Sequence, residues 1–325
     1  MASSAATIAG ARPHGRASFV KRVLSGDSLS QAVAFVCAMM ILVVTAALVF
    51  ELWTQSALSR HKFGFHFLAN STWDPVAENF GALPFIYGTV VTSMLALLIA
   101  VPLGVGAAIF LAELAPPKLS DGMTFLIELL AAVPSVIIGL IGFLVLVPML
   151  NVVVPSIKDL LGDHAPFFFS GAFYGVSILS AGVVLSIMIA PYIISVSREV
   201  LLAVPKDLRE AALALGATRW ETTWQVVVPY ARRGIMGSIF LAMARALGET
   251  MAVTMVVGNV PKLTGSLLSA GDSMASVIAS QFTEAAGGVY LSSLIEVGLV
   301  LFGITIILNG AARLLILATT EKGAK

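Results

Sequence analysis

Six long apolar runs constrain this chain more than any other feature of its sequence. A helix needs about 20 consecutive, mostly apolar residues to cross a membrane. Runs of that length occur at about 30–52, 86–113, 122–150, 173–197, 234–258 and 291–318. We therefore predict an all-α, polytopic membrane protein with six transmembrane helices.

The composition excludes most other classes of protein. The 325-residue chain is 58% hydrophobic and only 11% charged, whereas soluble domains are about 25% charged. So few charges cannot cover a soluble fold of this apolar content, and disorder requires low hydrophobicity. The single Cys37 and four scattered histidines, with no HExxH motif, predict no metal site.

Lysine and arginine residues set the predicted orientation, because they concentrate on the cytoplasmic side of a membrane. With the N-terminus inside, the inner segments hold fourteen of the 19 basic residues and the outer segments hold four, while Arg245 lies in a span. We expect both termini to be cytoplasmic. Residues 1–28 are then a cytoplasmic tail, and 29–320 form one transmembrane domain. The first apolar run is longer than a signal-peptide core and is expected to be retained.

The first outer loop is rich in aromatic residues. We expect these side chains to lie at the membrane surface, where aromatic rings are enriched. They are Phe63, Phe65, Phe67, Trp73 and Phe80.

The inner segment 198–233 carries the most specific local pattern. Asp207 suits the positive N-terminal end of a helix, and Gly216 suits a helix stop. The residues TRWE at 218–221 have the spacing of a capping box, in which Thr and Glu each satisfy a backbone amide. We predict two short helices on the cytoplasmic face, the second ending near Pro229.

The same segment resembles the EAA loop of ABC importer permeases. The family form is EAA-x3-G-x9-I-x-L-P, and this chain has EAALALG at 210–216 and VVVP at 226–229. Valine replaces the family's isoleucine and leucine, a change of size and not of character. The resemblance implies a type I importer architecture and a helix that docks in a separate ATPase. The implied coupling residues are Asp207, Glu210, Ala211, Ala212 and Gly216.

No phosphate-binding loop of the form GxxxxGK[ST] occurs in the chain. The resemblance therefore implies that ATP and Mg bind in a partner ATPase and that this chain holds no cofactor. The chain is expected to be a transport subunit and not an enzyme.

The fifth apolar run contains a charged pair, Arg245 and Glu249. If the run is one helix, Arg245 lies about 16 Å from its start and Glu249 lies on the same face. A central arginine costs at least about 2.5–3.5 kcal/mol on insertion scales, so such residues usually line a polar path. The alternative is that the two charges neutralise each other and bind a neighbouring helix.

The chemistry of this pair favours one class of substrate. The planar guanidinium matches an oxyanion, but a carboxylate beside it repels that oxyanion unless the substrate donates a proton. Hydrogen phosphate carries such a proton near neutral pH and sulfate does not. We therefore expect Arg245 and Glu249 to favour hydrogen phosphate.

Three further sequence segments resemble one particular branch of this family. They are RALGETMAVTMVVGN at 245–259, ELLAAVPSVIIGLIG at 128–142, and the stretch 80–114. All resemble the phosphate-specific, PstC-like branch of the permease family. The implied setting is the bacterial plasma (inner) membrane. The implied partners are a second homologous (PstA-like) permease subunit, two ATP-binding subunits, an extracytoplasmic phosphate-binding protein and the lipid bilayer, with no nucleic acid.

Two residues of the third span join Arg245 and Glu249 as expected substrate-pathway residues: Glu128 and Ser135. Glu128 has an alternative role as a charge that reaches the interface. Ser135 has an alternative role as a partner for a carbonyl freed by a kink at Pro134. Glu113, beside the second inner loop, is expected to be solvated.

Alternative functions remain open from the sequence. A permease for another oxyanion, molybdate or sulfate, would share the EAA loop. A proton-coupled secondary transporter could use Glu249 as the proton carrier, but it has no use for a helix that docks in an ATPase. A membrane-embedded enzyme would need a cluster of nucleophilic or metal-ligating residues in the spans, and the sequence has none.

Overall fold

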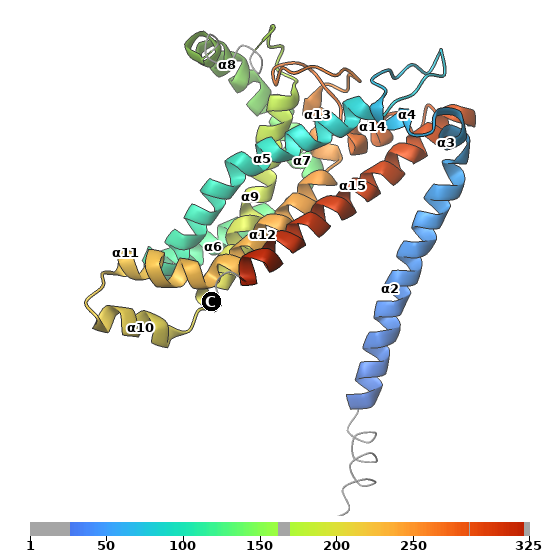
Figure 1. Ribbon diagram of the computed structural model, residues 1–325. Coiled ribbons are helices and arrows are strands. Elements are labelled where there is room, and N and C mark those ends of the chain that lie inside the picture. The colour runs from blue at the N-terminus through green and yellow to red at the C-terminus, as the bar shows by residue number, and fades with distance from the viewer. Residues whose placement is uncertain (1–26, 162–169, 286, 322–325) are drawn as a thin grey trace, which may run out of the picture. The chain divides into compact units, whose positions relative to one another are not determined.

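The computed structural model describes residues 27–161, 170–285 and 287–321 (Figure 1). The predicted tail over 1–28 lies almost wholly outside them. Within these ranges every regular element is a helix, and the only β-type pairing is an isolated bridge between Asp74 and Asn79. Six helical segments are long and apolar enough to cross a membrane. The predicted all-α fold with six spans is confirmed.

The chain divides into two units, and the described part of the first, residues 27–54, is helix α2 (Asp27–Gln55) without its last residue. None of the span Ser30–Gln55 is buried. Its two threonine hydroxyls donate to backbone carbonyls of the same helix, Thr45 to Ile41 and Thr54 to Glu51. These two hydroxyls therefore need no partner outside the helix, whose exposed surface is mostly apolar.

The second unit, which begins at Gln55, holds the other five candidate spans. Its α-helices are α3 (Ala57–Phe63), α4 (His66–Ala69), α5 (Leu83–Ile109), α6 (Pro117–Ala131), α7 (Ser135–Ile141), α8 (Val147–Leu161), α9 (Ile178–Leu202), α10 (Lys206–Ala214), α11 (Arg219–Thr222), α12 (Val228–Leu247), α13 (Met251–Val257), α14 (Met274–Gln281) and α15 (Gly288–Glu321). Three π-helical turns join some of them: η1 (Phe110–Leu114), η2 (Gly142–Leu146) and η3 (Thr223–Val227).

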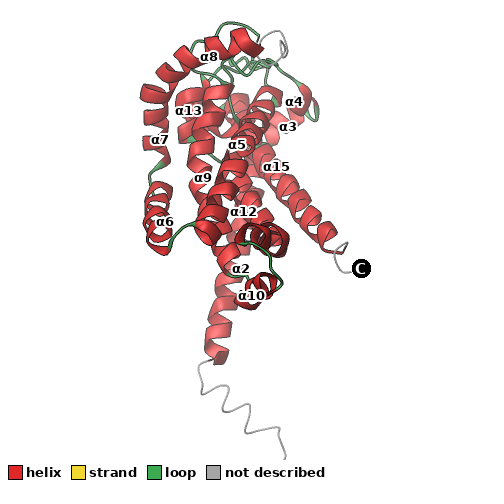
Figure 2. Ribbon diagram, turned by 90° about the vertical axis from the view of Figure 1, so that its left-hand side faces the viewer, coloured by secondary structure: helices red, strands yellow, loops and turns green. Residues whose placement is uncertain are grey.

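Helix α9 forms the centre of this unit, with α5 along one side and α12 and α13 along others (Figure 2). Leu185, Ile189 and Ile193 of α9 are fully buried. Glycines permit the close approach of α5 and α9: a Cβ on Gly104 would lie 2.9 Å from Ile193, and one on Gly182 would lie 2.5 Å from Leu95. Small residues at helix contacts are typical of membrane proteins, where dispersion drives packing.

The aromatic residues of the first outer loop correct one expectation. Phe67 and Phe80 are fully buried, whereas Phe65 is 92% exposed. Trp73 packs edge-on against Phe80 and Phe85, with ring centroids 4.8 Å apart in both pairs. Most of these rings therefore form a buried core and not an exposed belt.

Two predicted spans are interrupted. Residues 122–150 do not form one helix, because α6 ends at Ala131 and α7 begins at Ser135. Pro134 explains this break, since it lacks an amide donor and disfavours a helical conformation at the preceding residue. Residues 234–258 are also divided, with α12 ending at Leu247 and α13 beginning at Met251.

Gly88, near the N-terminal end of α5, makes a very tight backbone contact. A Cβ at this position would lie 1.8 Å from the carbonyl oxygen of Asp272, in the loop before α14. The methionine that follows two residues later donates its amide to the Thr89 hydroxyl at 2.9 Å. The outer end of α5 is thus fixed to this loop by backbone contact.

We predict that Gly88→Ala destabilises the protein, because the loop must move to admit the methyl group. Overpacking of this kind costs about 1–3 kcal/mol or more. Gly106→Ala is the matched control on the same helix, since a Cβ there has nothing within 4 Å. Thermal unfolding in detergent should show a lower midpoint for Gly88→Ala alone, and equal midpoints for the two variants would refute the contact.

Candidate functional site

The two helix breaks lie side by side. A Cβ on Gly139 of α7 would lie 2.8 Å from the Cα of Ala252 in α13, and one on Gly142 would lie 3.5 Å from Val256. Both helices therefore run in the same direction in close contact (Figure 2). Gly139 lies four residues after the start of α7, and Ala252 lies one residue after the start of α13. The non-helical segments 132–134 and 248–250 before these helices therefore lie within about one helical turn of each other along the helix axes.

The four predicted pathway residues flank these two breaks. Arg245 lies in the last turn of α12, and Glu249 lies in the break itself. Glu128 lies near the end of α6, and Ser135 is the first residue of α7. Arg245 and Glu128 are exposed, while Glu249 and Ser135 are half-buried. Among the residues that the structure describes, no hydrogen bond or ion pair joins any two of the four.

The predicted geometry of the charged pair is wrong. Arg245 and Glu249 do not share a helix face, because α12 ends at Leu247 between them. Helix α12 begins at Val228, so Arg245 lies about 26 Å along it from its first residue and about 16 Å from Gly234, where the apolar run begins. The Glu249 carboxylate accepts a hydrogen bond from the amide of Ala252 at 3.2 Å and so caps α13. The alternative that Arg245 and Glu249 neutralise each other is also wrong, because no ion pair joins them among the described residues.

The two helix breaks bring together polar groups that can contact a substrate. A helix break leaves backbone amides and carbonyls without partners, which lipid cannot supply. Broken helices at membrane depth are typical of transporter binding sites, where free backbone groups and a few polar side chains meet the substrate. The two breaks add one guanidinium, two carboxylates and one hydroxyl to those backbone groups. Two of these four groups, Arg245 and Glu128, are exposed in this chain.

The proposed coupling residues lie on α10 and just after it. Asp207, Glu210 and Ala211 are exposed, Ala212 is half-buried, and no residue of α10 is buried. Gly216 has φ +91°, a conformation that favours glycine, and it ends the helix as predicted. The helix therefore offers its surface to a partner.

The predicted capping box is present at the start of α11. The Thr218 hydroxyl accepts from the amide of Glu221, and the Glu221 carboxylate accepts from the amide of Thr218 at 2.8 Å. The expected helix end near Pro229 is wrong, however. Helix α11 continues through η3 into α12, and Pro229 lies in the first turn of α12, where its missing amide donor costs little.

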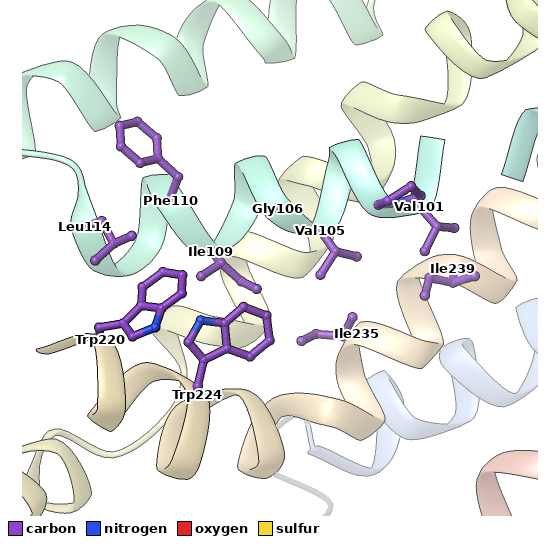
Figure 3. Close-up of a pocket in the computed structure, with 11 residues that line it drawn as sticks. Val101, Val105, Gly106, Ile109, Phe110, Leu114, Trp220, Trp224, Ile235 and Ile239 are labelled. Atoms are coloured by element: carbon purple, nitrogen blue, oxygen red, sulfur yellow. The ribbon is translucent and has the colours of Figure 1, made fainter. Parts of the chain in front are cut away.

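An apolar groove of about 560 Å³ lies between the inner end of α5 and the α11–α12 segment (Figure 3). The rings of Trp220 and Trp224 meet edge-on at its rim, with centroids 5.6 Å apart. Figure 3 shows aliphatic side chains such as Ile109, Ile235 and Ile239 along its length. Such a lining cannot stabilise an anion, so this groove is not the substrate site.

One ion pair at the inner end was not predicted. Nη2 of Arg209 lies 2.8 Å from Oε1 of Glu113, and the two side chains are 19% and 11% exposed. The expectation that Glu113 is solvated is therefore wrong. The available signal was an acidic residue at the inner end of one span and a basic residue in the next long inner loop. Sequence alone did not say which basic residue reaches it.

A second missed residue is Asp272, which lies outside the six spans. It is 1% exposed, and only one of its carboxylate oxygens is bonded, to the amide of Ser273 at 2.8 Å. Burial raises the pKa of Asp272 to about 7, against the smaller, opposite effect of the hydrogen bond from the Ser273 amide. No sequence pattern marks this aspartate among the polar residues of its loop.

Comparisons with known proteins agree with this arrangement. A family model described as "Binding-protein-dependent transport system inner membrane component" matches residues 100–319. The chain is 43% identical over 301 residues to a phosphate transport system permease protein PstC of Mesorhizobium japonicum, covering 92% of each chain. It is 46% identical over 282 residues to the protein of that name from Pasteurella multocida, covering 86% of this chain and 87% of the other.

A solved structure resembles the fold across most of the chain. It is a bacterial alginate ABC transporter in complex with an alginate-bound periplasmic protein. The match has a TM-score of 0.58 at 15% identity and covers 90% of this chain and 94% of the other. At this identity the likeness shows the fold alone, and the predicted type I importer permease architecture is confirmed.

The buried carboxyl of Asp272 predicts a pH-dependent stability. Its pKa of about 7 in the folded chain exceeds the reference value of 3.8. Between these values the folded chain holds a proton that the unfolded chain has released, so stability falls as pH rises through this window and levels off above it. Asp272→Asn keeps the oxygen that accepts from Ser273 and removes the titration. We expect the variant to lose this slope and to unfold at a higher temperature than the parent at about pH 8.

Thermal unfolding measured across this pH range checks the prediction. Asp121→Asn is the control, because the Asp121 side chain is 79% exposed, and it should keep the slope of the parent protein. A slope that persists in Asp272→Asn would show that another group titrates.

Proposed function

The chain belongs to the family of binding-protein-dependent transport system inner membrane components, and we propose that it is the permease subunit of an ATP-driven importer of inorganic phosphate. It is a multi-pass membrane protein and a transport subunit. Phosphate enters the cytoplasm by alternating access of the membrane domain to the two sides. The observation that carries this proposal is 43% identity to a phosphate permease over nine-tenths of both chains.

The proposed substrate path runs past the two helix breaks. Arg245 binds the oxyanion through its guanidinium, which matches phosphate geometry and stays charged. Glu249 accepts the proton of hydrogen phosphate in a hydrogen bond and repels an oxyanion that has no proton. Glu128 and Ser135 complete the polar lining from the neighbouring break. Their support is the closeness of the two breaks, within about one helical turn, and the exposure of Arg245 and Glu128.

The proposed partners follow from the surfaces that this chain leaves uncovered. A second, PstA-like permease covers the exposed charges at the breaks. One of two ATP-binding subunits receives α10 through Asp207, Glu210, Ala211, Ala212 and Gly216. ATP and Mg bind in those subunits and not in this chain. An extracytoplasmic binding protein delivers phosphate to the outer face. Both termini are cytoplasmic, which the basic inner segments support.

The proposed role of Glu249 in selecting phosphate over sulfate can be tested while its hydrogen bond to the start of α13 is kept. Glu249→Gln keeps an oxygen to accept from the Ala252 amide but removes the negative charge. We expect sulfate, which competes poorly with phosphate in the parent, to inhibit labelled phosphate uptake at about tenfold lower concentration, equivalent to about 1.4 kcal/mol of relieved repulsion. Glu78→Gln, on the exposed outer surface, is the control. Unchanged competition by sulfate or molybdate would remove Glu249 from substrate selection.

Docking of α10 can be tested by charge reversal. Glu210→Arg should lower ATP-dependent phosphate uptake at least about tenfold at matched membrane levels, because a wrong charge in an interface costs several kcal/mol. Glu78→Arg makes the same change on the outer surface and should leave uptake unchanged. Uptake that survives both ATP depletion and Glu210→Arg would instead support a proton-coupled carrier. Normal ATP-dependent uptake in Glu210→Arg would exclude Glu210 from the interface.

A further inference from the structure

Arg209 differs from the rest of α10, because its side chain turns back toward the membrane domain. Its Nη2 donates to Glu113 Oε1 at 2.8 Å and to the carbonyl of Leu201 at 2.8 Å. Its Nε donates to Glu113 Oε2 at 3.3 Å, and its Nη1 donates to the carbonyl of Val204. A single guanidinium therefore makes four hydrogen bonds, two of them to one carboxylate in the fork geometry that only arginine provides.

The partners of Arg209 belong to the two central helices of the membrane domain. Glu113 lies in η1, the π-helical turn that extends the inner end of α5. Leu201 lies in the last turn of α9, and Val204 lies in the link between α9 and α10. Helices α5 and α9 form the most extensive helix pair in the chain. Arg209 thus joins α10 to both members of that pair.

Helix α10 also contacts η3 and α11, but it has no buried core of its own. None of its residues is buried, and its large apolar side chains Leu208 and Leu213 are 38% and 44% exposed. A helix without a buried apolar face is not positioned by hydrophobic packing. The Arg209 contacts are therefore the main side-chain attachment of α10 to the helices above it. A helix that passes movement to a neighbour requires such an attachment, since a loosely held helix would swing instead.

We propose that the Glu113–Arg209 ion pair is the positioning link that transmits displacement of α10 to α5 and α9 during transport. The pair touches neither substrate nor nucleotide. It keeps α10, η1 and the end of α9 as one rigid body, so that movement of an ATP-binding subunit reaches the membrane domain. This inference rests on the proposed function of the chain as an importer permease.

The test measures phosphate transported per ATP hydrolysed. The complete transporter, with its ATP-binding subunits and binding protein, is reconstituted in liposomes with Glu113→Gln, with Arg209→Gln and with both. We expect ATP hydrolysis to stay within about twofold of the parent while phosphate uptake falls at least about tenfold. The double variant should lose no more than either single variant, because residues that act as a unit are not additive. Lys62→Gln and Glu78→Gln break an exposed outer pair and should change neither quantity.

The outcomes separate transmission from a purely structural role. Unchanged transport per ATP in Glu113→Gln would overturn the proposal. So would a parallel loss of hydrolysis and uptake together with dissociation of the ATP-binding subunits, since the pair would then only hold the docking surface. Should the glutamine variants not assemble, Arg209→Lys keeps the charge but not the fork. It should give an assembled complex with intermediate transport per ATP, and a normal ratio would refute the link.

The parent transporter in the same liposomes tests the proposed function separately. ATP-dependent uptake of molybdate or sulfate in place of phosphate would revise the substrate and leave the ion-pair test intact with that ion. Uptake independent of ATP would overturn both proposals.

Discussion

The membrane offers a backbone no hydrogen-bonding partners, and the rest of this structure depends on that constraint. Each unsatisfied amide or carbonyl in lipid costs several kcal/mol, so the chain crosses as helices that bond internally. Hydroxyls in the spans follow the same rule: Thr92 donates to the carbonyl of Gly88, and Ser186 to that of Val183. Against this background the two interruptions at 132–134 and 248–250 are costly features. Because the two breaks are close together, the polar groups at both of them can line a single substrate path.

Helix packing follows from a second property of lipid, which is as apolar as the helices themselves. Association then depends on close contact and on a few buried polar pairs. Glycines at the α5–α9 contact allow the close approach of these two helices. The buried hydroxyls of Ser197 in α9 and Ser238 in α12 lie 2.7 Å apart and form one such polar pair. The centre of the unit therefore combines these small-residue and hydroxyl contacts with the buried aliphatic side chains of α9, while many other large apolar side chains are exposed.

The sequence predicted correctly those features that depend on residues close together in the chain. Apolar run length predicts the six spans, and the spacing around Gly216 and Thr218 predicts the end of α10 and the start of α11. Features that depend on partners far along the chain were missed. Glu113 and Arg209 are 96 positions apart, and hydropathy cannot pair them. Phe67 and Phe80 look like interfacial aromatics until the fold covers them. The end of α12 before Glu249 was missed because apolar residues resume at Met251 and no proline marks the break; Gly248 and the polar residues Glu249 and Thr250 were the available signal.

Helix α5 is anchored at both ends to parts of the chain that belong to opposite faces. Near its outer end, Gly88 has no room for even a methyl group against the loop before α14. At its inner end, η1 holds Glu113 against Arg209. A helix turns about 100° per residue, so a one-residue insertion or deletion between these anchors would rotate one contact out of register with the other. The number of residues between the two anchors is therefore fixed. Related chains should vary freely in loop length but keep the 25-position interval between Gly88 and Glu113.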